Sequence, residues 1–338
     1  MNNVLLTGLL ALGLLGQQPP TSAPWSMDLS QFKPYGYNKG EGNYVIAPMY
    51  SNAPELMAQD GVPKGKVSDF IVKSTDSPLF PGIAKNKPGE VVPYERRCWV
   101  YVPAQYQPGK PAPLLVTHDA MGRGELPTIL DNMIAAKRLP AMVVVFISSG
   151  GGDAQGSERG LEYDTVSGKY AEYIESVILP RVTRDYGVTF SKDPDARATM
   201  GCSSGAAAAF SMAWFHPELY RRVISYSGTY VDQQSPKNPE SPRGAWEYHA
   251  SILPKEKRKP LRIWMHVSEN DLRSKDPEET LHNWVMANDR FSRVLKAKKY
   301  PYQFVFSKES GHCDGRVERQ TLAQALEFAW KGYKDRGR

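Results

Sequence analysis

Residues 196–210 of the chain read ARATMGCSSGAAAAF. The segment opens with a short apolar run that ends at Met200, and it closes with alanines, which favour a helix. Between them lies the pattern Gly-x-Ser-x-Gly, whose small residues permit a sharp turn with a serine at its apex. The segment therefore predicts a strand, a turn that exposes the Ser203 hydroxyl, and a helix over 204–215 whose first residues lie beside that hydroxyl.

Apolar runs of strand length recur on both sides of this segment. Nearly continuous runs are typical of strands buried on both faces of a parallel sheet. Helical spacing of apolar residues lies between some of them, as over 171–182, and a last helix is expected around 322–329. This alternation predicts an α/β fold with a mostly parallel central sheet and helices on both faces. Strands are expected at 67–74 and 96–102, as an antiparallel pair, and at 113–117, 142–147, 196–200, 223–226, 261–267 and 304–306.

The 338 residues, of which 41% are hydrophobic, are enough for one large domain with an extension. We expect the main α/β domain at 61–338 and, because 17–60 is rich in Pro, Gly, Asn and Tyr without periodicity, an extended N-terminal arm there. Residues 1–16 resemble a secretory signal peptide, since an apolar run begins at Val4 and is too short to span a bilayer. The sequence thus predicts a secreted or periplasmic protein without a membrane span.

The formal net charge is +6, but the basic residues are spread along the chain. No nucleic-acid recognition motif accompanies the densest basic segment, residues 255–259, so we interpret it as a solvated loop and expect no nucleic-acid partner. Three cysteines exclude a disulfide-rich scaffold and a zinc-finger pattern. We expect no metal and no cofactor, and the sequence predicts no particular oligomeric state.

A serine nucleophile needs a general base, normally a histidine, and an acid that orients it. In a parallel sheet, residues that follow the carboxyl ends of the strands gather at one edge. His312 follows the last expected strand and is our candidate for the base, while His118, at the end of the strand at 113–117, is the alternative. Asp271 ends the segment that follows the strand at 261–267 and is our candidate for the acid.

Two other carboxylates, Glu269 and Asp276, lie close enough to Asp271 in sequence to serve as alternative acids. Asp271 can also be interpreted as a purely structural turn residue, because Asn-Asp pairs often form turns. The order serine, acid, histidine, which the Gly-x-Ser-x-Gly turn accompanies in parallel-sheet hydrolases, places the acid between Ser203 and His312. Asp271 is favoured because it ends the segment that follows the penultimate expected strand.

Two of the three cysteines flank the candidate residues. Cys202 precedes Ser203, and Cys313 follows His312. If the serine and the histidine meet, the two cysteines must also approach disulfide distance. We therefore expect a Cys202–Cys313 disulfide, with two buried free thiols as the alternative, and Cys98 as an unpaired core residue.

An ester-cleaving site also needs amide donors for a developing oxyanion. The Ser204 N–H, at the start of the helix, is one candidate. The second is expected from the loop after the strand at 113–117, from either Asp119 or Ala120. Trp246 and Trp284 fall where they can border a substrate pocket, although packing in the core is an equally good interpretation of both.

At this point the chain resembles a known group, the enterochelin-esterase-like branch of the esterase D superfamily. Feruloyl and acetylxylan esterases of carbohydrate esterase family one are relatives of that group. The resemblance covers roughly residues 60–335 and implies an α/β-hydrolase fold with Ser203 as nucleophile, Asp271 as acid and His312 as base. The group usually has Asp-Gly where this chain has Asp119-Ala120. The resemblance rests on Arg96–Pro103, Leu114–Ala120, Arg159-x-x-Glu162, Gly201–Gly205, Asn270–Leu272 and Gly311–His312.

These observations lead to one principal hypothesis and two alternatives. The principal hypothesis is a secreted serine carboxylic ester hydrolase that acts on a small-molecule or polysaccharide-linked ester, with feruloyl and acetyl esters implied by the resemblance. An acyltransferase of the mycolyltransferase type would use the same three residues with an alcohol as acceptor. A non-catalytic binding protein on the same fold is the third hypothesis.

Overall fold

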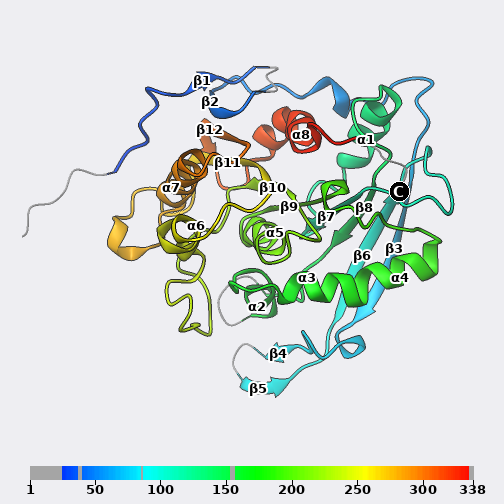
Figure 1. Cartoon of the computed structure of the whole chain (residues 1–338), viewed down its shortest axis with the longest axis horizontal. Helices are drawn as coiled ribbons and strands as arrows, with labels where there is room; N and C mark the ends of the chain where they lie inside the picture. Colours follow the sequence, from blue (N-terminus) through cyan, green and yellow to red (C-terminus); the bar gives the residue numbers. More distant parts are fainter. Residues whose placement is uncertain (1–24, 37–39, 85–86, 153–156, 335–338) are drawn as a thin grey trace, which may run out of the picture.

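A computed structural model of the chain describes residues 25–36, 40–84, 87–152 and 157–334 (Figure 1). The expected signal peptide at 1–16 lies outside the described residues, as does the first part of the expected arm. The centre of the molecule is a ten-stranded sheet in the order β1-β2-β12-β11-β10-β9-β7-β8-β6-β3, and β4 and β5 form a separate hairpin.

The strands are β1 (Lys33–Pro34), β2 (Gly42–Ile46), β3 (Lys66–Lys73), β4 (Ile83–Ala84), β5 (Lys87–Val91), β6 (Glu95–Val102), β7 (Leu114–His118), β8 (Val143–Ile147), β9 (Arg197–Cys202), β10 (Arg222–Tyr226), β11 (Arg262–Asn270) and β12 (Tyr302–Gly311). The α-helices are α1 (Leu126–Ala135), α2 (Glu158–Tyr163), α3 (Lys169–Tyr173), α4 (Leu179–Tyr186), α5 (Ser204–Phe215), α6 (Leu253–Lys255), α7 (Trp284–Ala297) and α8 (Gly315–Trp330). Short 3₁₀ and π segments complete the described helices, and the π segment Ile174–Ile178 joins α3 to α4.

In the spatial order of the sheet, the neighbouring strands β1, β2, β12, β11, β10, β9, β7 and β8 are all parallel. β6 is antiparallel to β8, and β3 is antiparallel to β6. The two antiparallel strands are the pair that the sequence predicted at 67–74 and 96–102. All six expected parallel strands are present within one to five residues of the expected bounds. Within the stretch expected to be an extended arm, β1 and β2 add two strands to the sheet beside β12.

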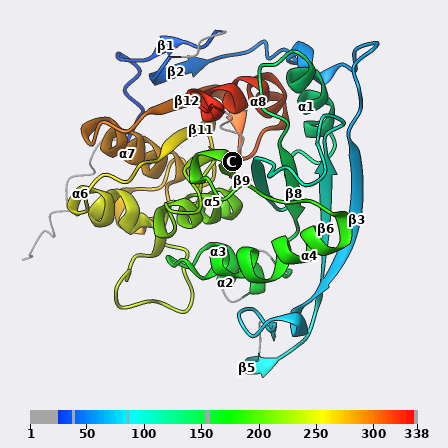
Figure 2. The ribbon, with the colours of Figure 1, turned by 45° about the vertical axis from the view of Figure 1, so that its right-hand side comes forward.

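Helices cover both faces of the sheet, as the sequence predicted. Successive residues of the central strands alternate between the faces, so that Leu115 packs in one apolar cluster and Val116 in the other. α1 and α8 cover the face of Leu115, and α3, α4, α5 and α7 cover the face of Val116 (Figure 2). This arrangement is the α/β-hydrolase fold. Among the described residues, no helix combines the length and the apolar composition that crossing a bilayer requires.

Candidate active site

Ser203 occupies the turn between β9 and α5. Its backbone takes φ 59° and ψ −131°, a conformation that side chain-bearing residues rarely adopt and that costs about 1–3 kcal/mol. A Cβ on Gly201 would lie 2.3 Å from the Gly205 backbone, and a Cβ on Gly205 would lie 2.9 Å from the His118 Cβ. Both glycines of the motif are therefore required for the chain to pass so closely, and the turn holds Ser203 at the carboxyl edge of the sheet.

His312 and Asp271 meet at the same edge. His312 lies just after β12 and Asp271 just after β11, and these strands are parallel neighbours. The His312 Nδ1 lies 2.6 Å from the Asp271 Oδ1. In this geometry Nδ1–H donates a hydrogen bond to the carboxylate, which leaves Nε2 as the nitrogen that can receive a proton.

The Asp271 carboxylate is buried and well supplied with donors. Burial by itself raises the pKa of Asp271, but the hydrogen bonds from His312, Ser227 and the Leu272 amide outweigh burial and hold the pKa below its ordinary value. Ser227 Oγ donates to Oδ2 at 2.7 Å, and the Leu272 N–H donates to Oδ1 at 2.7 Å. Asp271 is thus kept ionised beside the imidazole, as an orienting group requires.

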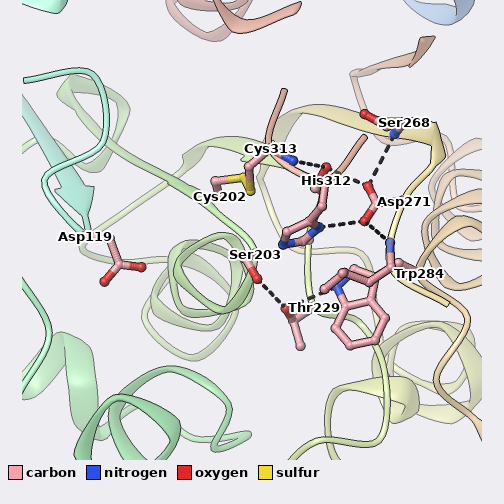
Figure 3. Close-up of a disulfide and its surroundings, with 12 residues drawn as sticks. Asp119, Cys202, Ser203, Thr229, Ser268, Asp271, Trp284, His312 and Cys313 are labelled. Carbon is pink, nitrogen blue, oxygen red and sulfur yellow. Dashed lines mark hydrogen bonds and ion pairs between the residues drawn. A yellow bond between two sulfur atoms is a disulfide. The ribbon is translucent and has the colours of Figure 1, made fainter. Parts of the chain in front are cut away.

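The Ser203 hydroxyl lies 3.4 Å from the Thr229 hydroxyl, which accepts a 3.3 Å hydrogen bond from the Trp284 indole. Figure 3 shows the His312 ring beside Ser203 on one side and hydrogen-bonded to Asp271 on the other. Within the described part of the chain, no hydrogen bond joins Ser203 to His312. Hydrogen bonds between a serine and its general base commonly tighten only when substrate is bound.

The Cys202–Cys313 disulfide is present, as the sequence predicted. It joins residues 111 positions apart, with a Cα–Cα distance of 6.2 Å. The disulfide therefore links the turn that carries Ser203 directly to the loop that carries His312 (Figure 3). Cys98 is buried and unpaired, also as expected.

The candidate oxyanion donors lie around the start of α5. Ser204 is the first residue of this helix, so its N–H has no acceptor within the helix. Its hydroxyl accepts a 3.3 Å hydrogen bond from Gln233, which also donates to the buried carboxylate of Asp164 at 2.9 Å. Burial raises the pKa of Asp164 to about 6. Gln233 and Asp164 escaped the sequence analysis, because neither belongs to a motif.

The loop after β7 supplies the second candidate donor, and the structure separates the two residues that the sequence left open. Both Asp119 and Ala120 have a positive φ, of 53° and 52°. The Ala120 N–H donates to the Ile147 carbonyl at 3.1 Å. It is therefore engaged within the fold and is a poor oxyanion donor. The Asp119 N–H makes only a long 3.4 Å contact with the Tyr163 hydroxyl, and it remains the candidate.

The two tryptophans have different surroundings. Trp284 is near the candidate triad, with its ring centroid 6.3 Å from that of His312. Trp246 is buried and packs against His249 and the Arg290 guanidinium instead. Both rings belong to the same buried apolar cluster, so the structure places Trp284 beside the candidate triad and Trp246 away from it, each as a core residue.

The alternative base is excluded by its surroundings. His118 is fully buried, with Nδ1 2.7 Å from the Met200 carbonyl oxygen and Nε2 3.3 Å from the Met212 sulfur. Burial lowers its pKa to about 4. His118 therefore has no free nitrogen to offer to Ser203.

The alternative acids are also engaged elsewhere. The Glu269 carboxylate accepts from the Glu309 amide at 2.9 Å, and Asp276 pairs with Arg273 at 2.5 Å. Two further residues of the site escaped the sequence analysis, Ser227 and Thr229. Both follow the carboxyl end of β10, and that position is the one signal in the sequence that points to them. The described residues contain no cluster of metal-ligating side chains.

One family of known proteins matches most of the chain. Residues 90–326 match the family described as "Putative esterase". The chain belongs to this esterase family. Among curated proteins, none matches the chain.

Solved structures of other esterases share the fold of this family member. The enterobactin esterase of Shigella flexneri, in the presence of 2,3-di-hydroxy-N-benzoyl-glycine, is 19% identical with a TM-score of 0.54, over 80% of this chain and 61% of that one. The chain thus spans about three fifths of the length of that protein. A CE1 ferulic acid esterase of Anaeromyces mucronatus, in complex with ferulic acid, is 12% identical with a TM-score of 0.57, over 83% of this chain and 96% of that one.

Proposed function

We propose that this esterase-family member is a secreted serine carboxylic ester hydrolase that acts through Ser203, His312 and Asp271. The observation that carries the proposal is the 2.6 Å contact between His312 Nδ1 and Asp271 Oδ1, formed beside the strained turn of Ser203. A buried, ionised carboxylate behind an imidazole that faces a serine is the arrangement that activates a serine nucleophile.

The proposed reaction follows from these positions. Ser203 Oγ attacks the ester carbonyl while His312 Nε2 takes its proton, and Asp271 stabilises the imidazolium that forms. The Ser204 and Asp119 amides are the proposed donors to the oxyanion of the tetrahedral intermediate. His312 then protonates the leaving alcohol as the acyl-enzyme forms. Water, deprotonated by the same imidazole, attacks the acyl-enzyme and releases the acid.

The proposed substrates are feruloyl, acetyl or other carbohydrate-linked esters. Ferulic acid esterases with the same fold support this class. Secretion is proposed from the apolar N-terminal run and from the disulfide, since such bonds persist in oxidising compartments.

The test of the triad is a pair of serine variants. Ser203→Ala should reduce kcat on a 4-nitrophenyl ester by at least about a thousandfold, because the nucleophile is lost. Ser176→Ala removes an exposed hydroxyl on the helical segment between α3 and α4 and should leave kcat unchanged. A Ser203→Ala variant that matched the wild type would refute the proposed nucleophile and favour a non-catalytic protein.

The substrate class is tested with a panel of feruloyl, acetyl-sugar and cyclic-trilactone esters. The proposal predicts the highest kcat/KM on a carbohydrate-linked ester. Added acceptor alcohol separates hydrolysis from acyl transfer, because a transferase converts the acyl group into a new ester whereas a hydrolase releases the acid. A preference for the cyclic trilactone would overturn the proposed class without affecting the triad.

A further inference from the structure

A cavity of about 620 Å³ opens at the amino ends of β10 and β11. Ser203, Asp271 and His312 lie at the carboxyl ends of the parallel strands, so this cavity is at the opposite edge of the sheet. Eight basic and three acidic residues line it. The excess of positive charge is therefore concentrated in one concave surface.

Two of the arginines that line this cavity lie on neighbouring strands. Arg222 and Arg262 begin β10 and β11 and are direct partners in the parallel register. Both side chains project to the face covered by α8, where Arg222 lies 5.4 Å from the Trp330 ring and Arg262 lies 5.1 Å from the Phe328 ring. Like charges opposite each other on neighbouring strands destabilise a sheet unless negative charge compensates them.

The compensation provided by the protein is incomplete. Arg222 donates to the backbone carbonyls of Asp195 and Ala329. The Nη1 of Arg262 is buried and makes no hydrogen bond to any described residue, and the Glu41 Oε1 lies 3.7 Å away, beyond hydrogen-bond reach. A buried guanidinium nitrogen without an acceptor costs free energy, which a bound anion would recover.

The pKa values of Arg222 and Arg262 are consistent with incomplete compensation of their charges. Burial lowers the pKa of Arg222 to about 10, and the Arg262 charge lowers it further while Asp195 opposes the shift. Burial also lowers the pKa of Arg262. Two arginines at the cavity have a carboxylate partner: Arg221 lies 3.2 Å from Asp195, and Arg262 lies 3.7 Å from Glu41.

We infer that this cavity binds a small multivalent oxyanion, a compound with two or more phosphate or carboxylate groups. The Arg262 fork can hold one oxyanionic group through paired hydrogen bonds, which suit the guanidinium geometry. Arg258, Lys259 and Lys299 line the same cavity and supply charge for a second group. The site is independent of the proposed esterase activity, because the two sites lie at opposite ends of the parallel strands.

The experiment measures binding of inorganic pyrophosphate and of citrate to the full chain by calorimetry, at constant ionic strength. The inference predicts saturable binding of at least one probe with one site per chain, and the tighter probe identifies the preferred chemistry, phosphate or carboxylate. Arg262→Gln should weaken that binding at least tenfold, and Lys299→Gln, at an exposed position, should weaken it measurably.

Arg97→Gln is the matched control, because it removes one positive charge from an exposed position on β6, far from the cavity. It should leave binding unchanged, and hydrolysis by all of the variants should equal that of the wild type. Absence of binding by both probes would overturn the inference. Equal binding by the Arg262→Gln, Lys299→Gln and wild-type chains would overturn it as well.

Discussion

Asp271 illustrates how one residue links the chemistry of the site to the stability of the fold. Its carboxylate is removed from water, yet donors from three directions favour the ionised form. The pKa is consequently below the ordinary value of 3.8. A group of this kind stabilises the folded state above its ordinary pKa, and that stabilisation disappears as the pH falls through the pKa of the folded state.

Asp271→Asn should therefore have two effects. The kcat should fall about 10³–10⁴-fold, because an amide can hold the imidazole in the wrong tautomer. The free energy of unfolding should also fall at pH 7, by an amount that shrinks between pH 4 and pH 2, since protonation removes the same charge from the wild type. Urea unfolding at several pH values measures the difference, and a gap that stayed constant down to pH 2 would contradict this account.

The three candidate triad residues, which the structure brings to one edge of the sheet, share a property. Ser203, His312 and Asp271 each follow a strand whose apolar run is unmistakable, so their common edge can be inferred without coordinates. Thr229 follows a strand as well, but its contact with Ser203 depends on how the loop after β10 folds back. The sequence could not choose between the Asp119 and Ala120 amides as oxyanion donors, because all backbone amides have the same chemistry. Only the hydrogen bond from the Ala120 N–H to the Ile147 carbonyl distinguishes the two.

At the scale of elements, the turn between β9 and α5 depends on the absence of two side chains. Gly201→Ala places a Cβ 2.3 Å from the Gly205 backbone, so the turn must shift. We expect a loss of about 1–3 kcal/mol in the free energy of unfolding, together with a large loss of kcat. Gly315→Ala, at the first residue of α8 with no atom within 4 Å of the new Cβ, is the control.

The control should be neutral or slightly stabilising, because alanine favours a helix by about 0.5–1 kcal/mol over glycine. Thermal unfolding of the two variants compares them directly. A Gly201→Ala chain as stable and as active as Gly315→Ala would mean that the turn is not constrained as described.

The disulfide joins two loops that follow β9 and β12, strands that are not neighbours in the sheet. Its reduction should lower the free energy of unfolding by about 2–5 kcal/mol, and kcat should fall because Ser203 and His312 are then held independently. Activity and urea unfolding with and without dithiothreitol measure both effects. The double variant Cys202→Ala, Cys313→Ala is the control, since dithiothreitol should no longer affect it. Full activity of the reduced wild type would show that the sheet is sufficient to align the two residues.

The elements themselves differ in how much of their structure was visible in the sequence. The helix expected at 204–215 has these bounds in the structure, because Gly205 and Pro217 bracket an apolar run. β1 and β2 were missed, since two and five residues with no alternation of polar and apolar side chains give no periodic signal. Their position depends on the pairing of β2 with β12, which lies some 260 residues further along the chain. Local secondary-structure propensity carries no information about so distant a contact.

In the whole molecule, a buried ion pair ties the antiparallel edge of the sheet to the helical layer. Arg96 of β6 and Glu162 of α2 pair with both side chains fully buried. Glu162 also accepts from the Tyr94 hydroxyl and from the Gly150 amide, each at 3.0 Å. The strand, the helix and the loop after β8 therefore share one carboxylate.

Glu162→Gln should lower the free energy of unfolding by about 3–5 kcal/mol, because it leaves a buried guanidinium without its counter-charge. Asp69→Asn is the matched control. Asp69 of β3 pairs with Arg97, which lies on β6 next to Arg96, and this exposed ion pair should contribute no more than about 1 kcal/mol. Chemical unfolding of both variants gives the comparison. Equal losses would show that burial of the Arg96 pair has no energetic consequence.

The pairing of β2 with β12 has a consequence for biosynthesis. Residues 42–46 are hydrogen-bonded to residues 303–307, so the ribosome must add some 260 residues after β2 before this margin of the sheet can close. Until β12 has been synthesised, the backbone groups of β2 that pair with it have no partner in the sheet. The molecule can reach its final topology only after translation, or after passage through a translocation channel, has delivered the last strand.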